Sequence, residues 1–317
     1  MFEVNRILLV SQNPAEEQSL FDWTLALAKR KQASIKCLRV LPTTSSSVSI
    51  LLDDVSVTGL VNKQTQHALE SMQAWSDHAS EQGVELETQV EFGKLFYKTV
   101  QQVLKDHVDL VVKQTDEEIK NLAHHVFGSQ DMHLLRKCPC PLLLHKQASP
   151  IILNKVMASI DVDIESETLK IDPLNQVILS VAQDVAQADN AFLHIAHAWQ
   201  ADAENLVRYW NSDLSDEDML SFSEKVRQQH LSALEYEIRT VRDAMPALQV
   251  HAAKGDAKEV IPQLVANLGI DLLVMGTLGR VGLPGLVIGN TAESILEQVE
   301  CSVLAIKPTD FVTPISV

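Results

Sequence analysis

The sequence has little of what secreted, membrane-spanning or nucleic-acid-binding proteins need. Four cysteines in 317 residues are too few for a disulfide framework. The chain has no run of apolar residues long enough for a membrane span, and the apolar run near its N-terminus is too short for the core of a signal peptide. Basic residues number 26 against 42 acidic ones, and the net charge of −16 opposes nucleic acid and anionic membranes. We therefore expect a cytoplasmic protein with neither nucleic acid nor membrane as a partner.

Signatures of common catalytic sites are missing as well. The sequence contains no G-x4-G-K-[ST], H-E-x-x-H or G-x-S-x-G motif, and none of the S-G-G-x-D-S or H-I-G-H motifs of adenylating enzymes. Without a P-loop lysine, the sequence shows no motif that would catalyse fast phosphoryl transfer. We expect a protein that is not a dedicated enzyme, although a slow ATPase using water beside Asp161 stays open.

The histidines and cysteines give one weak indication of metal binding. His124, His125 and His133 lie near Cys138 and Cys140 and could form a mixed zinc site. The C-x-C spacing leaves little room for a zinc knuckle, and Cys140 borders an apolar strand. His194 and His197 lie an odd number of residues apart on a predicted strand and face opposite sides. We therefore predict no metal ligands.

What the sequence does contain is a repeat. Each half carries the same series of strand-length apolar runs, separated by segments of helical periodicity. The matching segments are 6–12 with 155–161, 35–41 with 193–199, 109–115 with 271–277, and 133–146 with 294–307. A repeat of this length is a duplicated domain. We predict one domain over residues 1–148, a second over 152–309, and a C-terminal tail over 310–317.

Helix-start signals precede several of the predicted helices. Asp172 before Pro173, and Asp256 three residues before Glu259, are typical of helix N-termini. Asn13 with Pro14 predicts a helix start in the first half, and a further helix is predicted after Gly289. Alternating strands and helices indicate the α/β class, with two tandem doubly wound parallel-sheet domains. Residues 45–57 are predicted as a surface loop with a short helix.

A glycine-rich stretch follows the strand over 271–275, in the second half. Gly276, Gly279 and Gly289 are spaced G-x2-G-x9-G, and Asn290 and Thr291 follow at the predicted start of a helix. Glycines let the backbone approach a phosphate closely, and ligands of open parallel sheets bind at the carboxyl ends of the strands. The stretch is therefore a candidate phosphate-binding loop.

This spacing, together with the tandem repeat, resembles the universal stress protein family, whose fold is adenine-nucleotide-hydrolase-like and whose ATP-binding members carry the same glycines. The resemblance implies ATP or a related adenine nucleotide as ligand, with Ala198 at the adenine and Asp161 beside the nucleotide. The full set of binding residues that it implies is Asp161, Ala198, Met275, Gly276, Gly279, Arg280, Gly289, Asn290 and Thr291. Asn290 departs from the Ser or Thr of the family at that place.

The first half lacks the equivalent loop. The positions matching Gly276 and Asp161 are Gln114 or Thr115 and Gln12, and acidic residues within 116–120 replace the region of Gly279, so nucleotide binding is not expected there. In the resembled family the last strands often form dimer contacts. The chain could therefore pair its two halves internally as a pseudo-dimer, as a monomer or within a homodimer.

The functions left open are of three kinds. The leading hypothesis is a stress-response sensor or regulator that binds an adenine nucleotide in its second half. The first alternative is a protein-interaction module that does not depend on nucleotide. The second is a slow ATPase, or a hydrolase or transferase acting on another phosphorylated metabolite.

Overall fold

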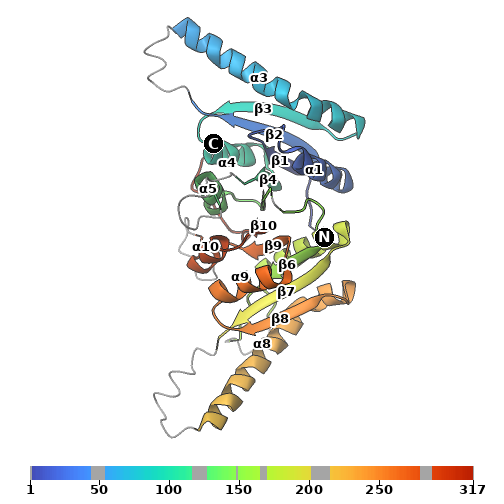
Figure 1. The fold of residues 1–317 in the computed structure, drawn as a ribbon, viewed down its shortest axis with the longest axis vertical. Helices are drawn as coiled ribbons and strands as arrows, with labels where there is room; N and C mark the ends of the chain where they lie inside the picture. Colours follow the sequence, from blue (N-terminus) through green and yellow to red (C-terminus); the bar gives the residue numbers. More distant parts are fainter. Residues whose placement is uncertain are drawn as a thin grey trace.

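The computed structural model describes residues 2–43, 54–115, 127–147, 149–164, 170–200, 215–278 and 288–316. Strands and helices alternate along both halves (Figure 1). The strands are β1 (Arg6–Val10), β2 (Ser34–Leu41), β3 (Leu86–Phe92), β4 (Leu110–Gln114), β5 (Leu142–His145), β6 (Lys155–Ser159), β7 (Phe192–Trp199), β8 (Gln249–Lys254), β9 (Leu272–Gly276) and β10 (Ser302–Ile306). The helices are α1 (Gln18–Lys31), α3 (Asp54–Glu81), α4 (Leu95–Asp106), α5 (Ser129–Lys137), α6 (Pro173–Asp189), α8 (Asp216–Ala244), α9 (Ala257–Leu268) and α10 (Asn290–Leu296).

The strands form one 10-stranded sheet in the order β3-β2-β1-β4-β5-β10-β9-β6-β7-β8. Each half contributes five strands in the same relative order, and the sheet passes from one half to the other between β5 and β10. That pair is antiparallel, with Leu144 opposite Val303 and Leu142 opposite Ala305, whereas the other neighbouring strands of the described sheet are parallel. The predicted α/β class is confirmed, and the internal pairing of the two halves makes the sheet mixed rather than wholly parallel.

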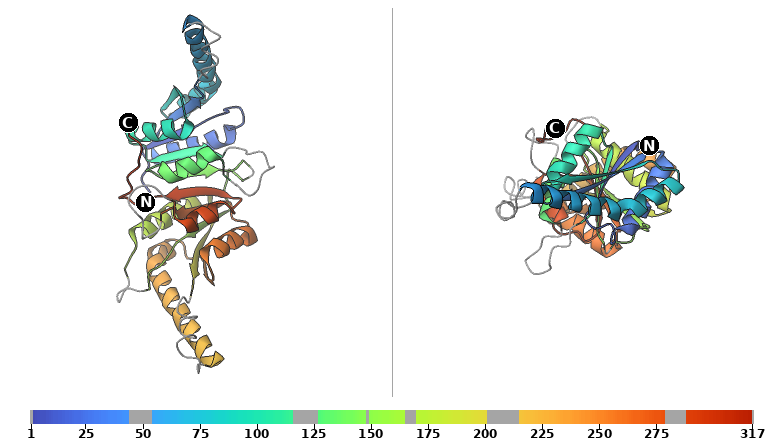
Figure 2. Two further views of the ribbon diagram at one scale, coloured as in Figure 1. Left: turned by 90° about the vertical axis from the view of Figure 1, so that its left-hand side faces the viewer. Right: turned by 90° about the horizontal axis from the view of Figure 1, so that it is seen from above.

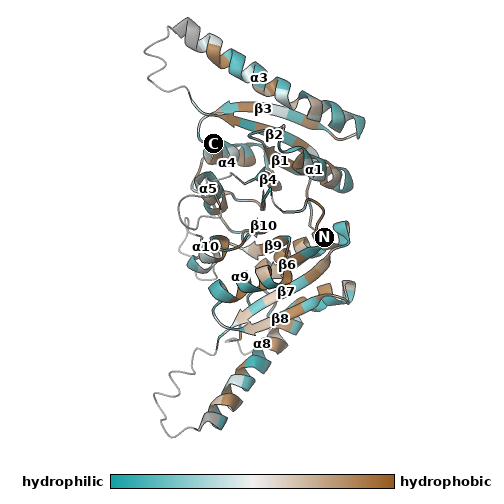
Figure 3. Cartoon of the chain, in the orientation of Figure 1, coloured by the Kyte–Doolittle hydropathy of each residue, from teal (hydrophilic) through white to brown (hydrophobic). Residues whose placement is uncertain are grey.

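Helices cover both faces of the sheet, and each face has a hydrophobic core that continues from one half into the other. One core joins α1, α3, α6 and α8 to the sheet, and the other joins α4, α5, α9 and α10. Because both faces are covered, strands such as β4 and β9 are apolar along most of their length. Along α3, apolar and polar residues alternate, in brown and teal in Figure 3. The helices α3 and α8 project beyond the body at opposite ends (Figure 2).

Two buried lysines cross the junction between the halves in opposite directions. Lys146, directly after β5, donates through Nζ to the carbonyl oxygen of Val299 at 2.6 Å. Lys307, directly after β10, donates to the carbonyl oxygen of Leu135 in α5 at 2.6 Å. Each lysine therefore binds a carbonyl of the other half at or just beyond the end of a helix, where unpaired carbonyl groups attract a cation. Burial lowers the pKa of Lys146 and of Lys307 to about 8.

Local capping explains where helices begin. Asp172 accepts from the backbone N–H of Leu174 at 2.8 Å, and Asp256 accepts from that of Lys258 at 3.0 Å, so both predicted N-caps are confirmed. The predicted helix start at Asn13 and Pro14 is wrong, since α1 begins at Gln18. The reason is Glu17, whose carboxylate turns back and accepts from the N–H groups of residues 12 and 13 at 3.2 and 3.3 Å.

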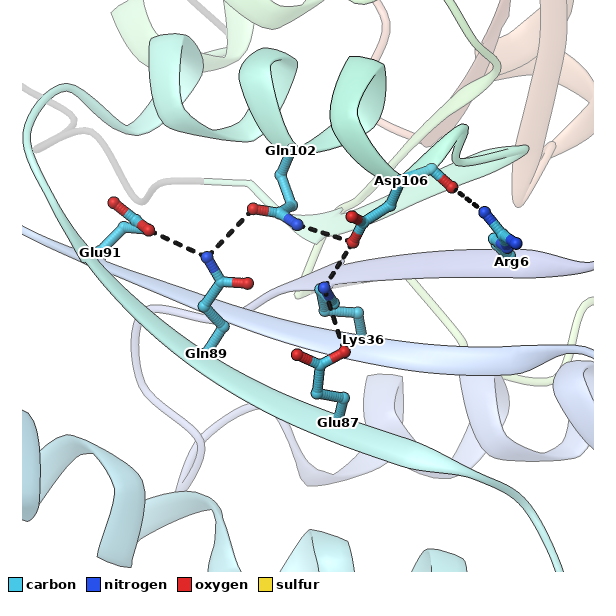
Figure 4. A network of polar contacts seen from close by, with 7 residues as sticks. All are labelled: Arg6, Lys36, Glu87, Gln89, Glu91, Gln102 and Asp106. Carbon is cyan, nitrogen blue, oxygen red and sulfur yellow. Dashed lines mark hydrogen bonds and ion pairs between the residues drawn. The ribbon is translucent and has the colours of Figure 1, made fainter. Parts of the chain in front are cut away.

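A polar network joins α4 to the outer strands of the first half (Figure 4). Lys36 of β2 lies 2.5 Å from a carboxylate oxygen of Asp106, at the end of α4, and 3.1 Å from Glu87 of β3. Gln102 donates to the same Asp106 oxygen at 2.6 Å and accepts from Gln89 of β3 at 3.1 Å. Burial alone would raise the pKa of Asp106, but the bonds from Lys36 and Gln102 hold it below its usual value. The network positions α4 over β2 and β3.

The segment predicted as a surface loop with a short helix is only partly described. Residues 45–53 lie outside the described residues, while residues 54–57 begin the 28-residue helix α3, which is much longer than predicted.

The C-terminal tail packs back on the body. Ile315 is buried in one hydrophobic core, and Gln101 of α4 donates to the carbonyl oxygen of Ser316 at 3.2 Å. Among the described helices, none is long and apolar enough to cross a bilayer.

The crossing lysines should make stability depend on pH. Below about pH 8 both folded and unfolded chains keep these protons, whereas between pH 8 and the ordinary lysine pKa of 10.5 the unfolded chain binds more of them. Stability from each lysine therefore rises with pH across that window, by up to about 3 kcal/mol. Urea unfolding at about pH 8 and about pH 10 should show wild type gaining stability relative to Lys307→Met and Lys146→Met.

The exposed Lys225 on α8 supplies the control, because Lys225→Met removes a lysine without removing a buried charge. Its stability difference from wild type should not change across the same pH window. If the stability differences between wild type and Lys146→Met or Lys307→Met also stay constant between about pH 8 and about pH 10, burial does not lower the pKa values of these two lysines.

Candidate functional site

A cleft of about 980 Å³ opens at the carboxyl ends of β6, β7, β8 and β9 in the second half. The loops leaving those strands line it, together with the starts of α6 and α9 and one face of α8. This is the edge at which open parallel sheets bind ligands, and the volume is within the range of small-molecule sites.

The structure brings most of the predicted binding residues together in this cleft. Six of them line it: Asp161, Ala198, Met275, Gly276, Gly289 and Thr291. Asn290 is exposed at the start of α10, beside two of these residues, but is not itself among the lining residues. Gly279 and Arg280 lie outside the described residues. Strands that are far apart in the chain therefore converge where the sequence pattern places them.

One residue links the two glycines of this group. Thr277, fully buried after β9, donates its backbone N–H to the carbonyl oxygen of Ile306 at 3.2 Å and accepts from the N–H of Gly289 at 3.0 Å. These bonds hold the start of α10 against the end of β9. Gly276 is also tightly surrounded, because a Cβ there would lie 3.1 Å from the Leu174 side chain of α6. Glycine at this position keeps space between β9 and α6.

The loop after β6 is fixed from α6. Asn175, 4% exposed, donates through Nδ2 to the carbonyl oxygen of Asp161 at 2.6 Å. The Asp161 side chain itself is 73% exposed, and one of its oxygens lies 3.9 Å from Nδ1 of the buried His197. The backbone of the loop is thus held by a buried amide, while its carboxylate stays accessible in the cleft.

Sequence reasoning missed the wall that α8 supplies. Phe222, Val226 and His230 of α8 line the cleft beside Trp199 of β7. The His230 ring lies 5.8 Å from the Trp199 ring and is hydrogen-bonded, Nδ1 to Nε2, to His197 at 3.0 Å. The Nδ1 atom of His197 also lies 3.2 Å from the carbonyl oxygen of Ile160. The signal available was the spacing of Phe222, Val226 and His230, which share a helix face at i, i+4 and i+8.

The described lining of the cleft is rich in carboxylates. Four acidic side chains line it, Asp161, Asp163, Asp172 and Asp256, against one lysine, Lys258. Two of the four, Asp172 and Asp256, are engaged as helix N-caps. A ligand with several negative charges would therefore be opposed by this part of the lining unless a cation accompanied it.

The first half carries a buried ion pair at positions that match two cleft-lining residues of the second half. Lys113, fourth in β4, matches Met275, fourth in β9, and Asp131, third in α5, matches Ala292, third in α10. Met275 and Ala292 line the cleft, whereas Lys113 and Asp131 form an ion pair at 2.9 Å with side-chain exposures of 1% and 0%. The ion pair therefore lies at the two positions that match cleft-lining residues of the second half. It is a stronger reason against nucleotide there than the acidic residues 116–120, which lie outside the described residues.

The residues of the weak metal hypothesis are separated or not described. His124 and His125 lie outside the described residues, and His133 packs against the ring of Phe96, 4.5 Å between centroids. Cys138 and Cys140 lie together, with their sulfurs 3.7 Å apart. Among the described residues, no three His, Cys, Asp or Glu side chains are arranged to hold a metal ion.

Comparison with known proteins agrees with this geometry. The sequence profile of the universal stress protein family matches residues 3–146 and 172–307, one copy in each half. The chain belongs to the universal stress protein family. It is a tandem member of this family of stress-response proteins, and the resemblance noted in its glycine spacing is confirmed at the level of the family.

Two curated relatives cover most or all of this universal stress protein. Universal stress protein E of Salmonella typhi is 27% identical over 319 residues, spanning 98% of this chain and 96% of the relative. Universal stress protein E of Escherichia coli K12 is 29% identical over 237 residues, spanning 74% of this chain and 72% of the relative.

Two solved structures share the fold of the whole chain. A universal stress protein from Archaeoglobus fulgidus has a TM-score of 0.66 at 15% identity and covers 96% of this chain and 99% of its own. A functionally unknown protein from Pseudomonas aeruginosa PAO1 has a TM-score of 0.68 at 23% identity, covering 97% of this chain and 94% of its own.

The buried Lys113–Asp131 pair predicts that the effects of removing its two members on the free energy of unfolding do not add. Lys113→Met or Asp131→Ala alone leaves one buried charge without its partner and should destabilise the protein by about 3 to 5 kcal/mol. The double variant carries at these positions the same residues as the second half, Met275 and Ala292. It should lose clearly less stability than either single variant. Urea unfolding of the four proteins measures the coupling free energy.

The exposed pair Arg242 and Glu235, 2.7 Å apart with side-chain exposures of 37% and 52%, is the matched control. Replacing either residue of this pair, or both, should change the free energy of unfolding by less than about 1 kcal/mol. If the loss of stability in the double variant equals the sum of the losses in the two single variants, Lys113 and Asp131 do not stabilise each other's buried charge.

Proposed function

We propose that this universal stress protein binds ATP or a related adenine nucleotide in the cleft of its second half, and acts as a sensor or regulator rather than as an enzyme of rapid turnover. The observation that carries the proposal is the convergence of six residues, predicted from the sequence, on one cleft at the carboxyl ends of neighbouring strands. The cytoplasmic location expected from composition remains a prediction.

The end of the cleft beside α8 suits a flat aromatic base. Trp199 is 5% exposed and, with Phe222 and Val226, gives the cleft an apolar wall next to Ala198. Rings stack favourably on such surfaces, and a purine would bury a large apolar area there. This supports placing the adenine near Ala198, the position that family resemblance assigned to it.

The other end of the cleft suits phosphates. Gly276 and Gly289 keep the backbone open beside Thr291, whose hydroxyl can donate a hydrogen bond, and Lys258 supplies positive charge. The four carboxylates of the lining argue for a nucleotide bound with Mg²⁺, since the cation offsets like-charge repulsion. We expect weaker binding when Mg²⁺ is removed by a chelator.

One alternative function retains specific support. The helices α3 and α8 project from opposite ends of the body and could present surfaces to other proteins without any nucleotide (Figure 1). In that case the cleft would not respond to ATP, ADP or AMP. Slow hydrolysis of a bound nucleotide, or action on another phosphorylated metabolite, would be recognised by turnover that is lost in Asp161→Ala.

A charge placed in the cleft tests the proposal. Thr291→Asp puts a carboxylate on an exposed residue of the first turn of α10, where acidic side chains are compatible with helix stability. Repulsion between this carboxylate and phosphate should weaken ATP binding about tenfold or more. Isothermal titration with MgATP measures the change.

Ser129→Asp is the control, because Ser129 is an exposed residue in the first turn of α5, which corresponds to α10 in the other half. The residue that matches Thr291 itself, Gln130, is less suitable because its side chain accepts from the N–H of Phe96. The Ser129→Asp variant should bind MgATP as wild type does. The proposal fails if wild type binds no adenine nucleotide at millimolar concentration, or if Ser129→Asp weakens binding as much as Thr291→Asp.

A further inference from the structure

A pair of cysteines lies at the junction of the two halves, away from the cleft. Cys138 directly follows α5 as its C-cap, donating its backbone N–H to the carbonyl oxygen of Leu134 at 2.8 Å, and Cys140 follows after one proline. The two sulfurs are 3.7 Å apart. Cys138 is 1% exposed, whereas Cys140 is half-buried and offers a route from solvent to the pair.

The surroundings favour a reactive sulfur at Cys138. The two thiols share a hydrogen bond in which either sulfur can donate, and the buried ammonium of Lys307 lies close enough to stabilise a negative charge on Cys138. These two effects lower the pKa of Cys138, and the hydrogen bond to Cys138 with burial raises that of Cys140. When one of the two thiols ionises, the hydrogen bond and Lys307 favour the negative charge on Cys138, and the thiolate is the form that attacks oxidants.

The other two cysteines provide an internal contrast. Cys37 is fully buried against Met72, and burial raises its pKa far above the usual range. Cys301 is 5% exposed, and burial raises its pKa to about 12. Both remain protonated at neutral pH and are covered from solvent. Of the four cysteines, only Cys140 is partly exposed, and only Cys138 and Cys140 have another cysteine sulfur within hydrogen-bonding distance.

We propose that Cys138 and Cys140 form a dithiol site that reacts with hydroperoxides and closes to a disulfide. The Cys138 thiolate attacks one peroxide oxygen, an S–O bond forms, the O–O bond breaks, and hydroxide leaves to take up a proton as water. The Cys140 sulfur then attacks the Cys138 sulfenic acid, an S–S bond forms, the S–O bond breaks, and a second water leaves. The two thiols are oxidised and hydrogen peroxide is reduced to two waters.

The geometry suits this closure. A disulfide bond is about 2.05 Å long, so the sulfurs must approach each other by about 1.7 Å from their present separation of 3.7 Å. Cys140 is the less buried of the two cysteines. Lys307 comes from the second half, so the charge that favours the Cys138 thiolate depends on the two halves being joined.

Mass spectrometry of the tryptic peptide 138–146 tests the proposal, because this peptide carries both cysteines and follows Lys137. The full-length protein is treated with hydrogen peroxide, free thiols are alkylated after unfolding, and the chain is digested. We expect the peptide to be unalkylated and lighter by two hydrogen atoms, while Cys37 and Cys301 remain alkylated. Reduction before alkylation should restore both modifications.

Two conservative variants separate the steps. In Cys140→Ser the disulfide cannot form, and dimedone should label a sulfenic acid at Cys138. Lys307→Met should slow the loss of thiols in the otherwise native protein, since it removes the charge that stabilises the thiolate. Retention of both alkylated thiols in the peptide, equal oxidation of Cys37 and Cys301, or a disulfide only between separate chains would overturn the proposal.

Discussion

The antiparallel pairing of β5 with β10 is the constraint on which the rest of the structure depends. It joins two five-stranded sheets, lets each hydrophobic core run through both halves, and fixes the two carboxyl edges relative to each other. The same junction buries Lys146 and Lys307 against carbonyl groups of the opposite half. Strand edges that would otherwise be unpaired are covered without a second chain.

Joining the halves gives them one scaffold but allows different sites. The end of β9 is opened by Gly276 and Met275, and α8 adds an aromatic wall, so a cleft remains. The end of β4 carries Lys113, which forms a buried ion pair with Asp131 of α5. Duplication therefore gives two similar folds, of which one has an open cleft and the other carries a buried ion pair at the matching positions. The cysteine pair lies where these two halves meet.

Much of the fold and of the cleft could be predicted, because they depend on residues close together in the sequence and on spacings that repeat in both halves. The duplicated strands, the N-caps at Asp172 and Asp256 and the residues that converge on the cleft follow from periodicity, capping and glycine spacing. Other features depend on contacts between distant residues. The Lys113–Asp131 pair spans eighteen positions through a segment outside the described residues, and the crossing lysines act on the opposite half of the chain.

The start of α1 illustrates the remaining error. Asn13 and Pro14 carry a helix-start signal, yet the Glu17 carboxylate competes for the backbone N–H groups after β1 and delays the helix. Such competition depends on where a buried side chain points, which spacing alone does not specify. The wall supplied by α8 was missed for a similar reason, because the spacing of Phe222, Val226 and His230 shows that they share a helix face but not that this face turns toward the cleft.

The central claim is that one fold occurs twice but offers a single open site. A crystal structure of the full chain grown with MgATP tests it most directly. The account predicts nucleotide density in the second half, with its phosphates beside Gly276 and Thr291, and none beside the Lys113–Asp131 pair. Density in the first half, or an empty cleft at saturating nucleotide, would contradict it.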